Sequence, residues 1–261
     1  MKKYEVNFIK ISKEKQNKMK KMIIKNMSFN RISDEKIELL EKKLNVKANI
    51  IISYRNQLLK EKVIKDHYKI INNIQNIIKD YDNKDIIEIS KKYNFSPMSV
   101  IRLIVKNKYP SYKLSLKNLN ELNKYDREQV LLAEENDTVA NLDQGDQQIK
   151  SEKYEEKIKH FLDNKKIKYK TQEELVTEQK EDKGYAYATP DFLLKEKIVI
   201  NDYIVNWIEV KNFYGTNINF MTKKIQKQIN KYYKNWGTGC LVYRYAVYEN
   251  LKLDNCIIIS F

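Results

Sequence analysis

The chain has 261 residues, enough for one or two domains with a sizeable buried core. Hydrophobic residues make up 42% and charged residues 33% of it, a balance typical of a soluble globular protein. No stretch approaches the roughly 18 consecutive apolar residues of a membrane span, which argues against an integral membrane protein. The two cysteines, Cys240 and Cys256, form no disulfide framework and lack metal-ligand spacing, so we expect a reducing intracellular compartment.

The net charge of +15 indicates a polyanionic partner such as nucleic acid. Residues 1–120 carry +16, residues 121–150 carry −5, and the remainder carries +4. The chain is rich in Lys, Asn, Ile and Tyr, whose codons are AT-rich, so genomic drift is an alternative source of the basic charge. The uneven distribution favours an N-terminal region that binds a phosphate backbone.

Residues 1–132 are predicted to be helical throughout, because they contain few helix breakers and apolar residues recur at helical spacing, as at Ile37, Leu40 and Leu44. The most informative stretch within them predicts a helix that carries Ile86 and ends near Tyr93. A turn follows, and Ser96 caps a second helix that begins at Pro97. This spacing is typical of a helix-turn-helix. The candidate nucleic-acid contacts on or just beyond the second helix are Arg102, Lys106 and Lys108. The alternative is a packing unit without DNA contact.

Residues 133–150 are acidic and polar, and we expect a linker or exposed loop there. The periodicity then changes, which predicts a separate domain over residues 151–261. The expected helices cover 152–164 and 218–235, and the expected strands cover 191–199, 203–210, 240–247 and 255–261. Mixed helices and β-branched strands make this half α/β, and the whole chain α+β.

Two neighbouring strands of this domain carry the most informative residues. Asp191 opens the first, and the second ends in Glu209-Val210-Lys211. A hairpin turn at residues 201–202 would bring Asp191 close to the end of the second strand. Glu209 and Lys211 are two positions apart and project from the same face, while Val210 packs inward and offers its backbone carbonyl.

This arrangement suits hydrolysis of a phosphodiester. Asp191, Glu209 and the Val210 carbonyl are oxygen ligands of the kind that Mg²⁺ or Mn²⁺ prefers. A bound cation would polarise the phosphoryl group and lower the pKa of a water, and Lys211 could orient that water or stabilise charge. The alternative is an ordinary solvent-facing strand. The Pro-Asp sequence at the right separation favours a site.

The flanking helices supply further candidates. Glu155 precedes Ile158 by three positions and lies on the inward side, as a third metal ligand and catalytic carboxylate. Gln228 lies at the margin of an inward stripe and could contact substrate or water. Three lysines of the same helix, namely Lys224, Lys227 and Lys231, are expected to bind the phosphate backbone. Each has a simpler alternative as part of a solvated helix surface.

The segments ATPDFLL, NWIEVKNFYG and QKQINKYYKNWGTGCLVYRY together resemble the TPD family of nucleases, which includes the animal codanin-1-interacting nuclease. The resemblance implies the PD-(D/E)xK superfamily, with a restriction-endonuclease-like mixed sheet flanked by helices. It also implies a divalent metal and nuclear residence, with the cytoplasm as an alternative, and suggests a codanin-like partner. The sequence therefore predicts a Mg²⁺- or Mn²⁺-dependent, structure-selective nuclease, with DNA as the expected substrate and RNA as the alternative. The alternative is a catalytically silent scaffold that binds nucleic acid. The sequence does not distinguish an endonuclease from an exonuclease, and it does not indicate the oligomeric state.

Overall fold

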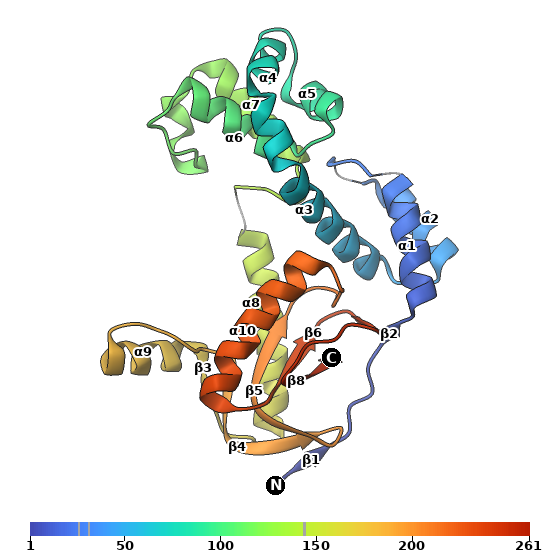
Figure 1. Cartoon of the computed structure of the whole chain (residues 1–261), viewed down its shortest axis with the longest axis vertical. Helices are drawn as coiled ribbons and strands as arrows, with labels where there is room; N and C mark the ends of the chain where they lie inside the picture. The colour runs from blue at the N-terminus through green and yellow to red at the C-terminus, as the bar shows by residue number, and fades with distance from the viewer. Residues whose placement is uncertain (26, 31, 143–144) are drawn as a thin grey trace. The chain divides into compact units, whose positions relative to one another are not determined.

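The computed structural model describes residues 1–25, 27–30, 32–142 and 145–261. The chain divides into two compact units, coloured by residue number in Figure 1. We call the first the sheet unit, which combines Met1–Lys18 with Gln147–Phe261. The second, the helical unit, comprises Met19–Asp146.

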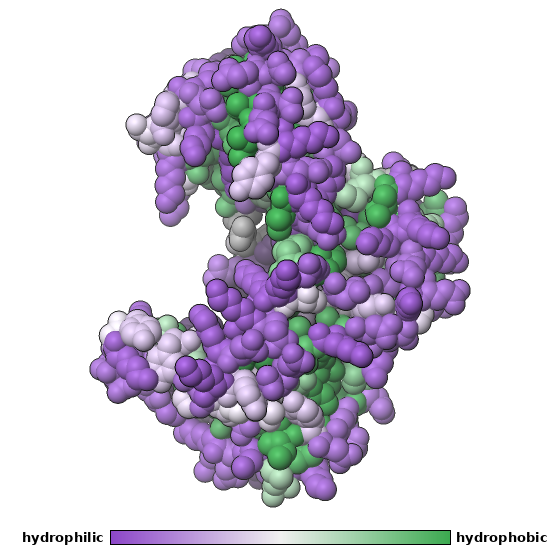
Figure 2. All heavy atoms as spheres, in the orientation of Figure 1, coloured by the Kyte–Doolittle hydropathy of each residue, from purple (hydrophilic) through white to green (hydrophobic). Residues whose placement is uncertain are grey.

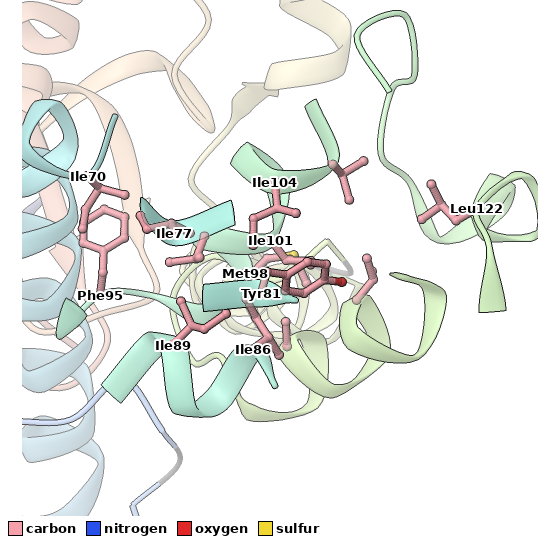
Figure 3. Packing of buried hydrophobic residues seen from close by; sticks show 14 of the residues in the cluster. Ile70, Ile77, Tyr81, Ile86, Ile89, Phe95, Met98, Ile101, Ile104 and Leu122 are labelled. Atoms are coloured by element: carbon pink, nitrogen blue, oxygen red, sulfur yellow. The ribbon is translucent and has the colours of Figure 1, made fainter. Parts of the chain in front are cut away.

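The helical unit consists of helices, and residues between 70 and 133 form a buried core within it. Helix α1 (Lys13–Lys25) enters it, followed by α2 (Asp34–Leu44), α3 (Ala48–Asn72), α4 (Ile74–Tyr81), α5 (Ile86–Tyr93), α6 (Pro97–Lys108), a 3₁₀ helix η1 (Leu116–Glu121) and α7 (Lys124–Asn136). Figure 3 shows Ile86, Ile89, Met98 and Ile101 of α5 and α6 packed together in this core. Burial of these apolar side chains stabilises this part of the unit.

The predicted turn between two helices at residues 94–96 is confirmed. Asn94 ends α5 in the left-handed region, with φ 46°. Ser96 accepts a hydrogen bond from the Ser99 N–H, and Pro97 occupies the first turn of α6. Nucleic-acid binding by this pair of helices stays a prediction.

The segment 133–150 differs from the linker that its composition predicts. Residues 133–136 end α7, and α8 (Gly145–Asn164) begins within it. Asp137 is buried and accepts hydrogen bonds from Ser96 Oγ and, at 3.1 Å, from the Met98 N–H. Its other oxygen accepts from the Val139 and Ala140 N–H groups. Asp137, which the composition places in a solvated loop, therefore caps the N-terminus of α6 and holds the backbone that follows α7 against it.

The sheet unit contains a mixed six-stranded sheet. Its elements are β1 (Lys3–Tyr4), β2 (Lys10–Ile11), α8, β3 (Tyr169–Thr171), α9 (Gln172–Lys183), β4 (Phe192–Ile200), β5 (Tyr203–Lys211), α10 (Asn219–Trp236), β6 (Gly239–Tyr243), β7 (Val247–Tyr248) and β8 (Cys256–Ser260). The strand order is β1-β4-β5-β6-β8, with β3 also paired to β4 and a separate pair β2-β7. The pair β4-β5 is antiparallel, whereas β5-β6 and β6-β8 are parallel. The expected mixed α/β architecture is confirmed.

The prediction of an all-helical N-terminal region is wrong for residues 1–11. Strand β1 pairs in parallel with β4, and β2 pairs in parallel with β7. Tyr4, Val6 and Phe8 alternate with polar residues and pack against the core of the sheet unit. Since residues 1–18 carry a net charge of +4, part of the N-terminal positive charge belongs to the sheet unit.

Helices α8 and α10 cover opposite faces of the sheet. Ile208 and Val210 of β5 pack with Ile158 and Leu162 of α8. Trp207, Glu209 and Lys211 alternate with these residues along β5 and face α10. The ring centroids of Trp207 and Tyr232 of α10 are 5.1 Å apart. Hydrophilic side chains cover most of the face of each unit that Figure 2 shows. No described helix combines the length and apolar composition needed to cross a bilayer.

The start of β6 leaves no room for a side chain at Gly239. A Cβ built there would lie 2.1 Å from the ring of the fully buried Trp207. We therefore expect Gly239→Ala to lower the free energy of unfolding by about 3 kcal/mol, because the added Cβ would displace the fully buried indole from its packed position. Chemical denaturation would measure the loss.

Gly184→Ala is the matched control for that substitution. Gly184 has φ +77° but nothing within 4 Å of the added Cβ, so only backbone strain of about 1–2 kcal/mol is expected. Equal stability losses in the two variants would contradict the packing argument.

Candidate active site

The β4-β5 hairpin brings the predicted site together. Asn201 and Asp202 both have positive φ, 45° and 62°, as a tight two-residue turn requires. Phe192 pairs with Ile208, so the start of β4 lies beside the end of β5. The predicted hairpin is confirmed, and Asp191 lies next to Glu209 and Lys211 where β4 begins and β5 ends.

Asp191 is fixed by the backbone of the opposite strand. One of its carboxylate oxygens accepts a hydrogen bond from the Val210 N–H at 2.6 Å. Burial, followed by repulsion from Glu209, raises the pKa of Asp191 well above its ordinary range. Two carboxylates are thus held in mutual repulsion, which a bound cation would relieve.

Glu209 is buried and accepts hydrogen bonds on both oxygens. Oε1 accepts from Lys211 Nζ at 2.6 Å and from Gln228 Nε2 at 2.8 Å. Oε2 lies 3.1 Å from the Tyr232 hydroxyl. Residues from β5 and α10 therefore hold this carboxylate in one orientation.

Lys211 and Gln228 face each other on the α10 side of the sheet. Besides Glu209, Lys211 Nζ donates to Gln228 Oε1 at 3.1 Å. The Lys211 and Glu209 side chains are only 13% and 6% exposed. A partly buried ammonium beside the carboxylate pair can neutralise charge that develops on a bound phosphate, because little water screens it there.

The Val210 carbonyl lies on the same side of β5 as Asp191. The Lys211 carbonyl accepts from the Arg244 N–H on the β6 side. Neighbouring residues of a strand direct their backbone groups to opposite sides, and one residue's N–H and C=O point the same way. The Val210 carbonyl therefore faces β4, as its N–H does toward Asp191, and is available as an oxygen ligand.

Glu155 approaches from the other face of the sheet, since it lies on α8. Burial, followed by repulsion from Glu209, raises the pKa of Glu155. Among the residues that the structure describes, no three His, Cys, Asp or Glu side chains form a compact metal-binding group. Two carboxylates and a carbonyl nevertheless fit Mg²⁺ or Mn²⁺, because such ions keep several waters at sites with one or two protein carboxylates. Glu155 as a third ligand stays a prediction.

The candidate nucleic-acid contacts differ in their surroundings. On α10, Lys224, Lys227 and Lys231 are exposed. In the helical unit Lys106 is exposed, whereas Lys108 Nζ lies 2.7 Å from the fully buried Asp126. Because Asp126 already neutralises the Lys108 charge, Lys108 is a weaker candidate for binding a phosphate. Arg102 is half-buried and donates to the Asn141 carbonyl at 3.4 Å.

Tyr232 is a site residue that the sequence analysis did not include. Its hydroxyl accepts from Gln228 Nε2 at 2.7 Å and lies within hydrogen-bond distance of Glu209 Oε2 and the Thr189 carbonyl, the latter at 3.2 Å. The signal was present in the sequence, because Gln228 and Tyr232 are four residues apart and share one side of a helix.

We expect Tyr232→Phe to lower the rate of the catalysed reaction and the affinity for a divalent cation by about tenfold, because Glu209 loses a group that orients it. The ring contact with Trp207 is kept, so the melting temperature should change little. Tyr233→Phe, at an exposed neighbouring position, serves as control. A Tyr232→Phe protein with wild-type rate and cation affinity would contradict this role.

Comparison with known proteins places these residues in a family. The model described as "Protein of unknown function TPD sequence-motif" matches residues 122–260. An uncharacterized protein of Acanthamoeba polyphaga mimivirus is 26% identical over 253 residues, which cover 90% of this chain and 85% of the viral protein. The CDAN1-interacting nuclease 1 of Gallus gallus is 32% identical over 94 residues.

The match to the avian protein covers 36% of this chain and 32% of that protein. No solved structure matches the chain. The family model spans more than half of the chain and includes Asp191, Glu209, Lys211 and Gln228. The chain therefore belongs to the TPD sequence-motif family.

Proposed function

We propose that this protein is a Mg²⁺- or Mn²⁺-dependent nuclease that hydrolyses phosphodiester bonds. The observation that carries the proposal is the cluster of Asp191, Glu209 and Lys211 where β4 begins and β5 ends. Asp191 and Glu209 repel each other there, and Lys211 Nζ lies 2.6 Å from Glu209. The partial match to a protein named as a nuclease supports the same reading. The resemblance of the site segments to the TPD nucleases also leads us to propose the restriction-endonuclease-like fold for this mixed sheet.

Each residue has a distinct proposed role. Asp191, Glu209 and the Val210 carbonyl would hold the cation, with Glu155 assisting from the α8 side. A cation held there would act as a Lewis acid on the phosphoryl group and lower the pKa of a bound water. Lys211 stabilises negative charge on the phosphate. Gln228 keeps the Lys211 and Glu209 side chains in place through a hydrogen bond to each, and Tyr232 orients Glu209.

Nucleic acid would contact the exposed lysines of α10, namely Lys224, Lys227 and Lys231, beside the site. The α5-α6 pair of the helical unit would add contacts through Arg102 and Lys106. DNA is the favoured substrate over RNA. A codanin-like protein partner and nuclear residence are proposed from the relative's name and the family resemblance alone.

The competing function is a scaffold that binds nucleic acid without cleaving it. A scaffold needs no Lys211 ammonium held between Glu209 and Gln228. It would also be destabilised by two carboxylates that repel each other and serve no purpose. The retained Asp-Glu-Lys group therefore favours the enzyme. A third reading, a helix-turn-helix regulator, leaves the sheet unit unexplained.

The proposal is tested by incubating labelled single-stranded, duplex and branched DNA and RNA with wild-type protein in Mg²⁺, Mn²⁺ or EDTA. Cleavage that needs the metal and disappears in Asp191→Asn would support the nuclease and identify its substrate. A folded wild type that binds these substrates and leaves all of them intact in either metal would favour the scaffold.

A further inference from the structure

The sheet unit contains a single arginine, Arg244, although lysine is abundant throughout the chain. The sequence has 50 basic residues, of which only five are arginines, and the other four lie in residues 19–146. Arginine presents a planar fork of donors that fits phosphate, which lysine does not. The position of this one residue is therefore more informative than that of any single lysine.

Arg244 follows directly after β6, at the edge of the sheet that carries the candidate active site. Its N–H donates to the Lys211 carbonyl at 2.9 Å. In open α/β sheets, ligands bind beyond the carboxyl ends of parallel strands, and β5 and β6 are such a pair. Arg244 is thus a near neighbour of the catalytic lysine through the backbone.

The Arg244 side chain is held in place on the α8 side. Nη1 donates to Asn212 Oδ1 at 2.8 Å and more weakly to the Lys150 carbonyl at 3.4 Å. Asn212 in turn donates to Ser151 Oγ, one helical turn before Glu155. The guanidinium lies over the Tyr154 and Tyr245 rings, 5.6 and 5.4 Å from their centroids. These cation–π contacts favour one position of the guanidinium.

The fixed guanidinium has unused hydrogen-bonding capacity. Within the described part of the chain, no Asp or Glu forms an ion pair with Arg244, and its Nε and Nη2 donate no hydrogen bond. A half-buried arginine that is oriented by an amide and two aromatic rings, yet lacks an acidic partner, is suited to bind an anion from outside.

We propose that Arg244 forms a phosphate-binding subsite, which holds a backbone phosphate next to the scissile one on the α8 side of the site. This inference rests on the proposed nuclease function and adds a substrate-binding residue to it. Asn212 and the Tyr154 ring preorganise the fork, so that little conformational freedom is lost when the phosphate binds. The α10 lysines would bind the strand as mobile point charges instead.

The test is binding of labelled single-stranded DNA, and of RNA of the same sequence, by fluorescence anisotropy in EDTA over a range of salt concentrations. Arg244→Gln should raise Kd about tenfold and lower the slope of log Kd against log salt by about one, because one phosphate contact is lost. Arg244→Lys should retain the slope but only part of the affinity. Lys252→Gln, an exposed position in the same unit, is the charge-matched control.

A second readout separates substrate binding from a purely structural role. Methylphosphonate replacement of individual phosphates around the mapped cleavage position should raise KM for the wild type at one flanking position. The same replacement should cause no further loss in Arg244→Gln. A wild type that binds DNA or RNA while Arg244→Gln binds with the same Kd and salt slope would overturn the subsite and leave the nuclease intact. Absence of any nucleic-acid binding by the wild type would overturn both.

Discussion

Lys211→Ala is expected to lower the single-turnover rate of phosphodiester cleavage by about 10²–10³-fold. The Lys211 side chain is only 13% exposed and its ammonium lies 2.6 Å from Glu209, so no water can replace it at equal strength. The affinity for a divalent cation should hold or increase, because the carboxylate pair then loses the positive charge that partly neutralises it. Lys211→Arg should not restore the rate, since the larger fork does not fit between Glu209 and Gln228.

Quenched-flow or gel assays with excess protein would measure the rate, and Mn²⁺ titration would measure cation affinity. Lys252→Ala provides the control for removal of a positive charge elsewhere on the sheet unit. A Lys211→Ala protein that cleaves within a few-fold of wild type would remove Lys211 from the catalytic machinery.

Asp191→Asn is expected to stabilise the cation-free protein while abolishing cleavage. The pKa of Asp191 is raised in the folded state by burial and by Glu209. In the unfolded chain the carboxyl titrates at about 4, so above that pH the folded state binds more protons than the unfolded state. Stability of the wild type therefore falls as the pH rises from about 4 through the raised pKa.

The Asn variant removes that pH-dependent loss and keeps an oxygen for the Val210 N–H. At neutral pH without divalent cation we expect a gain of about 1 kcal/mol or more, equivalent to roughly 2–4 °C in Tm. Excess Mg²⁺ or Mn²⁺ should raise the Tm of the wild type and leave the variant almost unchanged. Differential scanning fluorimetry across pH would measure both effects. Glu196→Gln, an exposed acid of β4, is the control. A variant that is less stable than wild type in EDTA at neutral pH would contradict the repulsion.

The centre of the site could be predicted from the sequence because it depends on local pattern. The turn residues Asn201 and Asp202 fix the hairpin, and the two-residue period of a strand places Glu209 and Lys211 on one face. Similarly, Ser96 and Pro97 mark the start of α6. In these places, short-range geometry alone brings the residues together.

Non-local pairing was harder to predict. Strands β1 and β2 are two residues each, and their partners lie 196 and 237 positions further along the chain. The helical pattern of the neighbouring residues therefore hid the alternation of Tyr4, Val6 and Phe8. Strand β3 and α9 were missed because neither has strong apolar periodicity. Short elements of this kind are stabilised by tertiary contacts, which a local window does not contain.

Side-chain partners also depend on the tertiary fold. Nothing in the sequence indicates that Lys108 pairs with the buried Asp126, or that Asp137 caps α6. The Gln228-Tyr232 contact was readable from helical spacing, but its connection to Glu209 requires α10 to pack on one particular face of the sheet.

The central claim is that Asp191 and Glu209 together bind a divalent cation, and its most direct test is Mn²⁺ binding followed by electron paramagnetic resonance of the free ion. This measurement needs no knowledge of the substrate. We predict a saturable site in the wild type whose affinity falls by at least about tenfold in Asp191→Asn and in Glu209→Gln. A folded wild type without saturable Mn²⁺ binding, or variants that bind as tightly as wild type, would contradict the account.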